Sequence, residues 1–287
     1  MIVIDSHVHP IYFEAICADE AAFRFRTQQF GVYKQSPYAL EETLTEMAVG
    51  RIDKTILLPL DISTRFGGHI VSNHEIRRIV DTAPERFIGF GSVDPNRSDA
   101  AEIVEQAFTE LRLSGLKLNP AKQGFRAGDP KVRPIYDLCV KFNKPIIFHS
   151  GMSWEPDAPA APGHPLEFED VAAGYPNLRI CLAHFGWPWV RETVMLMIKY
   201  PNVYTDTAML YLDSPVDFME QVFTRDMGKL TFERNFPNQV MFGSNAPRFR
   251  AFKLKAALEK LDMKESTREK LFGGNALTFL GEKGTIC

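Results

Sequence analysis

The chain has 287 residues, of which 45% are hydrophobic and 24% charged, and its formal net charge is −3. This composition supports a sizeable folded core and excludes a disordered chain. Both signs of charge are well mixed, so we expect a small-molecule substrate and no binding to nucleic acid or anionic lipid. No apolar run is long enough to cross a bilayer, and the first ten residues lack the features of a signal peptide. We therefore expect a cytoplasmic protein that does not associate with membranes.

Two histidines, His7 and His9, end a short apolar run at the start of the chain. In a strand, side chains two positions apart point to the same face, so both imidazoles can converge on one metal ion. Asp5 has the same parity and lies one layer deeper, where it could accept a proton from an imidazole. The first ten residues therefore predict a metal site.

Short β-branched runs then alternate with amphipathic segments along the whole chain. The predicted strands are residues 2–6, 55–60, 87–93, 115–118, 145–149, 179–184, 202–205 and 239–243. The amphipathic segments that predict helices include residues 40–50, 73–83, 100–113, 132–142, 166–174 and 188–199. Eight strand–helix units in about this length predict an α/β fold, a (β/α)8 TIM barrel, with residues 1–287 as one domain. A doubly wound open sheet is less favoured because no glycine-rich phosphate loop follows an early strand.

Two connections are longer than usual, residues 10–39 and residues 150–165. Both follow predicted strands, which places them over the C-terminal face of a barrel, where active sites lie. We expect them to be walls or lids of the pocket. The alternative is an insertion that forms an oligomer, since residues 13–33 could serve a homodimer as well as a substrate.

Polar side chains stand at the ends of the later strands as well. The strand-end residues after the first strand are Lys117, His149, His184, Asp206 and Asn245. A lone histidine after an apolar run is more often a packing residue than a ligand, but four on one rim favour a metal site.

The strand ends carry motifs in a fixed order. They read Ile-Asp-Ser-His-Val-His at the start, Gly-Leu-Lys-Leu-Asn-Pro at 115–120, Phe-His-Ser at 148–150, Leu-Ala-His-Phe-Gly at 182–186, Phe-Gly-Ser-Asn at 242–245 and Gly-Gly-Asn-Ala at 273–276. This pattern resembles the amidohydrolase superfamily, in the branch of aminocarboxymuconate-semialdehyde decarboxylase and related decarboxylases, lactonases and hydratases. The resemblance implies that His7, His9 and His149 bind one divalent metal ion, zinc or alternatively manganese. It also implies that His184 polarises or protonates the substrate.

Asn245 departs from that pattern, because the family generally has an aspartate there that binds the metal and shuttles a proton. An amide cannot act as a base, so the proton must be carried by another group. His184 is the candidate, with Asp206 as its orienting partner or an alternative base, or as a hydrogen-bonded structural residue. The asparagine is either natural or a deliberate inactivating change.

Lys117 has three interpretations: a carboxylated lysine that bridges two metals, a free ammonium that binds a substrate carboxylate, or a side chain that reaches solvent at the rim. We favour the free ammonium. Further substrate contacts are expected from Asn119, Trp154 and Arg248, with Arg250 as another candidate donor and Phe13 and Tyr33 as apolar walls.

Three functions fit these residues. The first is metal-dependent hydrolysis of a small, carboxylated lactone, amide or ester by metal-bound water. The second is non-oxidative decarboxylation of an aromatic or unsaturated acid. The third is a binding protein or an inactive enzyme that has lost turnover through Asn245.

Overall fold

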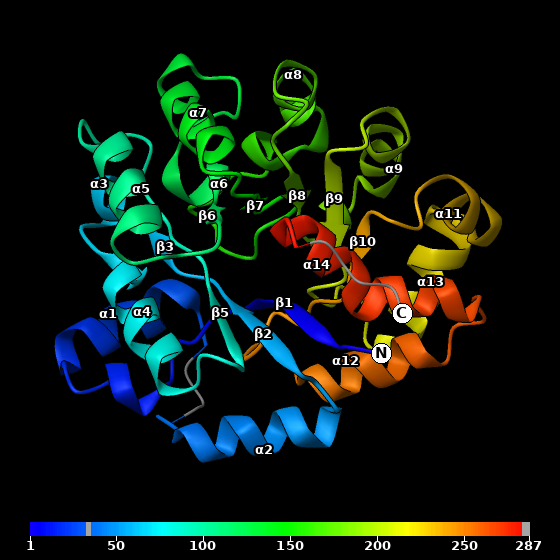
Figure 1. Cartoon of the computed structure of the whole chain (residues 1–287), viewed down its shortest axis with the longest axis horizontal. Helices are drawn as coiled ribbons and strands as arrows, with labels where there is room; N and C mark the ends of the chain where they lie inside the picture. Colours follow the sequence, from blue (N-terminus) through cyan, green and yellow to red (C-terminus); the bar gives the residue numbers. More distant parts are fainter. Residues whose placement is uncertain (33–35, 283–287) are drawn as a thin grey trace.

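The computed structural model describes residues 1–32 and 36–282. Its strands are β1 (Ile4–Val8), β2 (Lys54–Leu57), β3 (Leu60–Asp61), β4 (His69–Val71), β5 (Phe87–Gly89), β6 (Leu116–Leu118), β7 (Ile146–Phe148), β8 (Ile180–Leu182), β9 (Val203–Asp206) and β10 (Val240–Met241). All except β3 and β4 are parallel, in the orders β1-β2-β5 and β6-β7-β8-β9-β10 (Figure 1). Each of the eight predicted strands therefore has a counterpart in the structure, although several are shorter than predicted.

Hydrogen bonds join these two sheets at both seams. Between β5 and β6, Gly91 N donates to Gly115 O at 2.8 Å, and between β1 and β10, Ser6 N donates to Phe242 O at 2.9 Å. Parallel bridges at the same two places complete the ring. The (β/α)8 barrel is therefore confirmed, and the open sheet is excluded because the ring closes.

Helices surround the ring and fill the connections between strands (Figure 1). They are α1 (Glu20–Phe30), α2 (Leu40–Gly50), α3 (Ser63–Phe66), α4 (Asn73–Thr82), α5 (Ala100–Thr109), α6 (Pro120–Gln123), α7 (Arg133–Lys141), α8 (Glu169–Gly174), α9 (Val190–Lys199), α10 (Pro215–Glu220), α11 (Lys229–Asn235), α12 (Ala251–Glu259), α13 (Glu265–Glu269) and α14 (Asn275–Leu280). Single 3-10 turns are η1 (Glu14–Ile16), η2 (Pro130–Val132), η3 (Ala161–Gly163), η4 (Pro165–Phe168) and η5 (His184–Gly186), and π-helical segments are η6 (Gln221–Asp226) and η7 (Lys270–Gly274). No helix of the described ranges combines the length and the apolar character that a membrane span requires.

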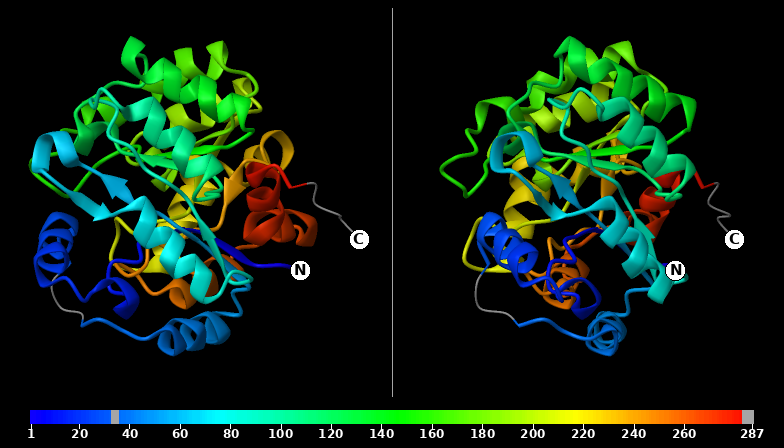
Figure 2. Two further views of the ribbon diagram at one scale, coloured as in Figure 1. Left: turned by 60° about the vertical axis from the view of Figure 1, so that its left-hand side comes forward. Right: turned by 90° about the vertical axis from the view of Figure 1, so that its left-hand side faces the viewer.

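The barrel interior is apolar at its N-terminal end. Inward side chains such as Ile4, Ile147 and Met241 are fully buried and pack with residues of α14. The ring of Phe279 on α14 lies 5.1 Å from the ring of Tyr204 on β9. Figure 2 shows α14 at one end of the barrel and α1 at the other. Because α14 seals the N-terminal end, a ligand must enter at the opposite, C-terminal end.

The second strand is shorter than the predicted 55–60. It ends at Leu57, and Leu60 instead begins β3, which pairs antiparallel with β4. Pro59 lies between the two strands and has no amide proton to donate to a ladder, so it ends β2. The hairpin of β3 and β4 was missed because each strand is only two or three residues long.

Candidate active site

The predicted site residues, both the strand-end residues and the further substrate contacts, meet at the C-terminal mouth of the barrel. A small cavity of 60 Å³ there is lined by most of them: His9, Lys117, Asn119, His149, Trp154, His184, Asn245 and Arg248. His7 and Asp206 are not in this lining, but the His7 ring lies 5.1 Å from that of His9 and 4.8 Å from that of His184. Side chains from six strand ends thus converge although the sequence separates them widely.

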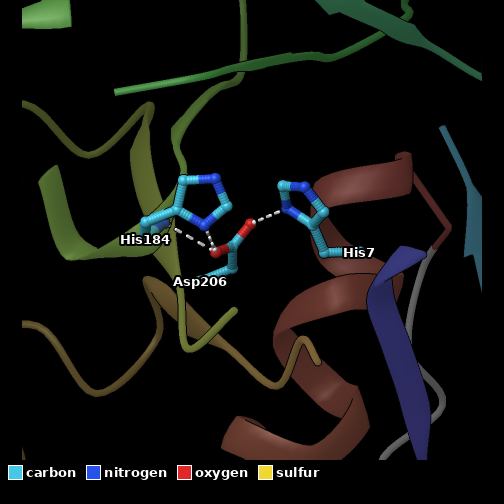
Figure 3. A group of neighbouring side chains, drawn as sticks. All are labelled: His7, His184 and Asp206. Carbon is cyan, nitrogen blue, oxygen red and sulfur yellow. Dashed lines mark hydrogen bonds and ion pairs between the residues drawn. The ribbon is translucent and has the colours of Figure 1, made fainter. Parts of the chain in front are cut away.

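Asp206, the last residue of β9, connects the first and sixth strands of the ring. Its Oδ2 accepts a hydrogen bond from His7 Nδ1 at 2.8 Å, and its Oδ1 accepts one from the backbone N–H of His184, also at 2.8 Å (Figure 3). Oδ1 also accepts from Ala208 N at 3.1 Å. These three N–H donors, the Cys181 thiol 3.8 Å from Oδ2 and complete burial hold the carboxylate in one position against the His7 ring.

Asp5 does not have the role expected for it. Its Oδ1 accepts from the backbone N–H groups of His7 at 3.2 Å and Ser244 at 2.9 Å, and its Oδ2 accepts from Ser244 Oγ at 2.6 Å. Burial raises the pKa of Asp5 to about 7. Asp5 therefore joins β1 to the end of β10, and Asp206 is the carboxylate that orients an imidazole.

Three histidines hold the same tautomer. His7 Nδ1 bonds to Asp206, His9 Nδ1 bonds to Leu58 O at 3.0 Å, and His184 Nδ1 bonds to Ala208 O at 2.8 Å. Carboxylate and carbonyl oxygens only accept, so each Nδ1 carries the proton and each Nε2 has a free lone pair. Burial lowers the pKa of each of these imidazoles well below the usual value, so all three are neutral.

These histidines fit a divalent metal ion. His7 Nε2 and His9 Nε2 lie 3.3 Å apart. Two nitrogens at about 2.1 Å from one tetrahedral ion are about 3.4 Å apart, so a shared ion accounts for this spacing of two lone pairs. Among the residues that the structure describes, His7, His184 and Asp206 form the one group of three or more potential ligands whose atoms all lie within 4.8 Å (Figure 3).

His149 follows β7 and faces the same cavity. Its ring lies 5.0 Å from that of His184, and its Nε2 forms a hydrogen bond of 2.9 Å with Ser153 Oγ. Burial lowers the pKa of His149 to about 3, so this imidazole is also neutral. His149 therefore lies with the other histidines at the strand ends, but Ser153, in the connection that follows β7, occupies its Nε2.

Lys117 lies inside the barrel and is only 2% exposed, which excludes the interpretation that its ammonium reaches solvent. Its Nζ has no hydrogen-bond partner among the described residues. Burial lowers its pKa to about 8. At neutral pH the barrel therefore contains an ammonium with no bonded anion, which is costly unless a ligand supplies one.

Asn245 follows β10 with φ at +60°, in the left-handed region that asparagine and aspartate tolerate better than most residues. Its Nδ2 contacts Met209 Sδ at 2.9 Å, and its Oδ1 is buried without a partner in the described part of the chain. The oxygen can accept a proton in a hydrogen bond or contact a cation, but it cannot take the proton away.

The remaining predicted contacts lie around the rim. Asn119 Oδ1 caps α6 by accepting from Lys122 N at 3.0 Å, and Trp154 is 57% exposed and stacks on Tyr211 with ring centroids 6.1 Å apart. Phe13 and Arg250 are not part of this cavity: Phe13 packs on Phe87, and Arg250 pairs with Glu46 on the surface. Tyr33 is outside the described residues.

Several lining residues were missed by sequence reasoning. They are Gln29 and Phe30 at the end of α1, Lys122 on α6, Ser153 and Glu155 beside Trp154, and Met209 and Tyr211 after β9. Four of them lie in the two long connections, whose length was the available signal. The others depend on how the connections fold back over the mouth.

Comparison with known proteins agrees with this geometry. The amidohydrolase family model matches residues 4–281. The chain belongs to the amidohydrolase family. This confirms the resemblance drawn from the order of the strand-end motifs.

Individual relatives are distant. The chain is 27% identical over 241 residues to 2-amino-3-carboxymuconate-6-semialdehyde decarboxylase of Dictyostelium discoideum, a match that covers 73% of this chain and 65% of that enzyme. It resembles an uncharacterised TIM-barrel protein of Bordetella bronchiseptica with a TM-score of 0.75, 21% identity and coverage of 98% and 99% of the two chains. It also resembles a manganese-bound mutant of 5-carboxyvanillate decarboxylase from Novosphingobium aromaticivorans, with a TM-score of 0.67, 19% identity and coverage of 98% and 97%.

Proposed function

We propose that this amidohydrolase-family protein catalyses the metal-dependent, non-oxidative decarboxylation of a small aromatic or unsaturated carboxylic acid. The observation that carries the proposal is the charge around the cavity. Among the residues that the structure describes, Lys117, Lys122 and Arg248 line it against a single carboxylate, Glu155, and the histidines are neutral. A cavity with this excess of cations selects an anionic ligand. One sequence relative, the Dictyostelium discoideum enzyme, is a decarboxylase, which supports this reaction over the hydrolysis that the sequence alone favoured.

The chemistry of the strand ends supports the same choice. Hydrolysis by bound water requires a base that removes a proton, and Asn245 cannot serve as that base, so His184 would have to take this proton as well. Decarboxylation breaks a carbon–carbon bond, releases carbon dioxide and leaves an electron pair on carbon, which must then receive one proton. The reaction therefore requires an acid and a site for negative charge, and it does not require a strand-eight carboxylate.

In this proposal His7, His9 and His149 would hold the metal ion, zinc or manganese. His184 and Asp206, which form a close group with His7, are left to relay the proton and to orient the His7 ring. A bound divalent ion supplies positive charge that orients the substrate's oxygens and offsets negative charge in the transition state. Asp206 fixes the His7 ring by its 2.8 Å hydrogen bond, and Lys117 binds a substrate carboxylate with its unpaired ammonium. His184 relays the proton through Nε2, whose lone pair is free because Nδ1 donates to Ala208 O: Nε2 takes up a proton from solvent and transfers it to the substrate carbon.

A mass-resolved activity screen tests the proposal. Protein reconstituted with zinc or with manganese is incubated with hydroxybenzoates, unsaturated dicarboxylic acids and lactones. We expect an acid to lose carbon dioxide, and we expect His184→Asn to remove most of this turnover, typically by a factor of about 10² to 10⁴ for a proton-transfer group. Addition of water to a lactone, without any decarboxylation, would establish hydrolysis instead.

The Asn245→Asp variant separates a working enzyme from an inactive one. If the parent decarboxylates an acid, Asn245 is part of a functional site. If only the aspartate variant does so, the parent is a binding protein or an inactive enzyme. The His74→Ala variant, on the exposed face of α4, is the control for both substitutions.

A further inference from the structure

Residues 152–157, called the strap below, fold inward across the mouth of the cavity. Ser153 Oγ forms the 2.9 Å hydrogen bond with His149 Nε2, and Glu155 Oε1 lies 3.8 Å from Arg248 Nη2. Both His149 and Arg248 line the cavity and belong to the proposed site. The strap therefore occupies two groups that a metal ion and an anionic ligand would use.

Two cations hold the strap against the end of α1. Arg248 Nη2 donates to Phe30 O at 2.6 Å, and its guanidinium lies 4.7 Å above the Phe30 ring. Lys122 makes the same two kinds of contact. Its Nζ donates to Gln29 O at 3.2 Å and lies 3.6 Å from Asp157 Oδ1. Each cation thus has one neutral partner on α1 and one carboxylate partner on the strap.

The carboxylates are the weaker partners. Their separations of 3.6 and 3.8 Å are beyond ordinary hydrogen-bond length, whereas the carbonyl contacts are within it or close to it. The Glu155 and Asp157 side chains are 27% and 43% exposed, but those of Arg248 and Lys122 are 20% and 4% exposed. Ion pairs of this kind contribute at most about 1 kcal/mol. A competing anion can therefore replace the carboxylate while the cation stays on α1.

The ends of the strap are anchored independently of these two contacts. Met152 N donates to Trp187 O at 2.8 Å, and Arg65 Nη2 donates to the carbonyl of Asp157 at 3.3 Å. The side chains of Ser153 and Glu155 lie between these anchors. Displacing them requires rearrangement of the middle of the strap only.

We propose that Glu155 stands in for an anionic group of the ligand on Arg248, and that ligand binding displaces the middle of the strap from the site. The cavity of 60 Å³ is far below the roughly 300 Å³ or more of a typical ligand pocket, so part of the lining must move to admit a ligand, and the 3.8 Å contact of Glu155 makes the strap the weakly held part. An acid with a second anionic group distant from the reacting carboxylate would bind Arg248 in place of Glu155. The inference rests on the proposed function in taking the ligand to be an acid, and it can be tested without turnover.

The test measures binding of isophthalate, a benzene ring with two carboxylates, to manganese-loaded protein by calorimetry. We expect Glu155→Gln to bind isophthalate about three- to fivefold more tightly than the parent, because the internal competitor loses its charge. Arg248→Met should bind it more weakly, and Glu155→Gln should have no further effect in the Arg248→Met background. Glu167→Gln is the matched control, since Glu167 pairs with Arg126 on the surface.

Amide hydrogen exchange of residues 152–158 provides a second measurement that needs no ligand. Exchange should be faster in Glu155→Gln than in the parent and unchanged in Glu167→Gln. Unchanged or weaker isophthalate binding by Glu155→Gln, no binding by either protein, or unchanged exchange in the strap would each overturn the inference. If isophthalate binds as expected but no acid is decarboxylated, the proposed reaction fails and the inference stands.

Discussion

The strand-end cluster and the strap lie against each other but are built differently. In the cluster, Asp206 and His7 are completely buried, and their contact is a hydrogen bond of 2.8 Å. In the strap, Glu155 is partly exposed and its contact with Arg248 is 3.8 Å long. Short, buried contacts hold a fixed geometry, whereas long, solvated ones exchange partners at little cost. The site therefore combines a rigid floor, the strand-end cluster, with a more weakly held cover, the strap.

The largest effect is expected from removing a proposed metal ligand in the floor. His7→Ala should abolish stoichiometric zinc or manganese binding, with an affinity loss of more than about 100-fold. Elemental analysis after incubation with metal and removal of the excess measures this. His74→Ala on exposed α4 should keep the metal of the parent. Tight stoichiometric binding by His7→Ala would show that the metal site lies elsewhere.

The next largest effect is expected from the carboxylate that orients His7. Asp206→Asn replaces one carboxylate oxygen with an NH2 group, which cannot accept the hydrogen bond from His7 Nδ1, and should reduce metal affinity by about 10- to 100-fold. Competition with a metal-binding dye measures the change, and circular dichroism verifies the fold. The matched control is Asp94→Asn, a buried carboxylate bonded to Thr64 and not to a histidine. Equal losses in both variants would assign Asp206 a general structural role.

We expect Lys117 to lower the free energy of unfolding and to contribute to ligand binding. In metal-free protein at pH 7, Lys117→Met should increase the free energy of unfolding by about 1 to 3 kcal/mol, because a buried charge without a partner is removed. The same variant should lose affinity for isophthalate. Urea unfolding gives the first quantity and calorimetry gives the second. A decrease in stability together with unchanged binding would indicate that Lys117 only packs.

The stabilisation by Lys117→Met should decrease as the pH rises. The pKa of Lys117 is about 8 in the folded chain and near 10.5 when unfolded, so the folded form binds fewer protons between these values. The loss of folding stability caused by the buried Lys117 ammonium is complete below pH 8, decreases as the pH rises from 8 to 10.5, and vanishes above pH 10.5. The stabilisation by Lys117→Met should therefore be smaller at pH 9.5 than at pH 7, as measured by urea unfolding at both values.

The smallest effect is expected from a substitution in the strap. It should strengthen metal binding, whereas the substitutions of His7 and Asp206 should weaken it. Ser153→Ala frees His149 Nε2 and should tighten metal binding by about two- to threefold, since a single neutral hydrogen bond contributes about 1 kcal/mol or less. The same dye competition measures it, with Ser266→Ala on exposed α13 as the control. Weaker metal binding by Ser153→Ala would mean that the serine supports His149 instead of competing for it.

Much of the fold was predictable because its signals are local. Each buried strand is an apolar run bounded by turn residues, and the strand–helix alternation specifies parallel pairing with the chain order that the structure shows. The strand that sequence reasoning made too long contains Pro59, whose effect on the ladder overrides the apolar character around it. The hairpin of β3 and β4 is too short to give a periodic signal.

The residues at the strand ends were predictable from the sequence, but the contacts of the strap were not. His9, His149, His184 and Lys117 were named because each follows or ends an apolar run, and the barrel brings such positions together. The roles of Asp5 and Asp206 could not be separated in this way. Both are carboxylates near strand ends, and only their partners distinguish the one that binds Ser244 from the one that binds an imidazole.

The sequence by itself therefore determined the barrel, the family and the set of histidines, because these depend on residue types at regular positions along single strands. Only the tertiary structure decided which histidine ring nitrogens are free to bind a metal ion and which site residues the strap covers. Asp206 reaches His7 across 199 residues, and Arg248 reaches Phe30 across 218. Such contacts depend on ring closure and on how two long connections pack, and no local pattern in the chain records either.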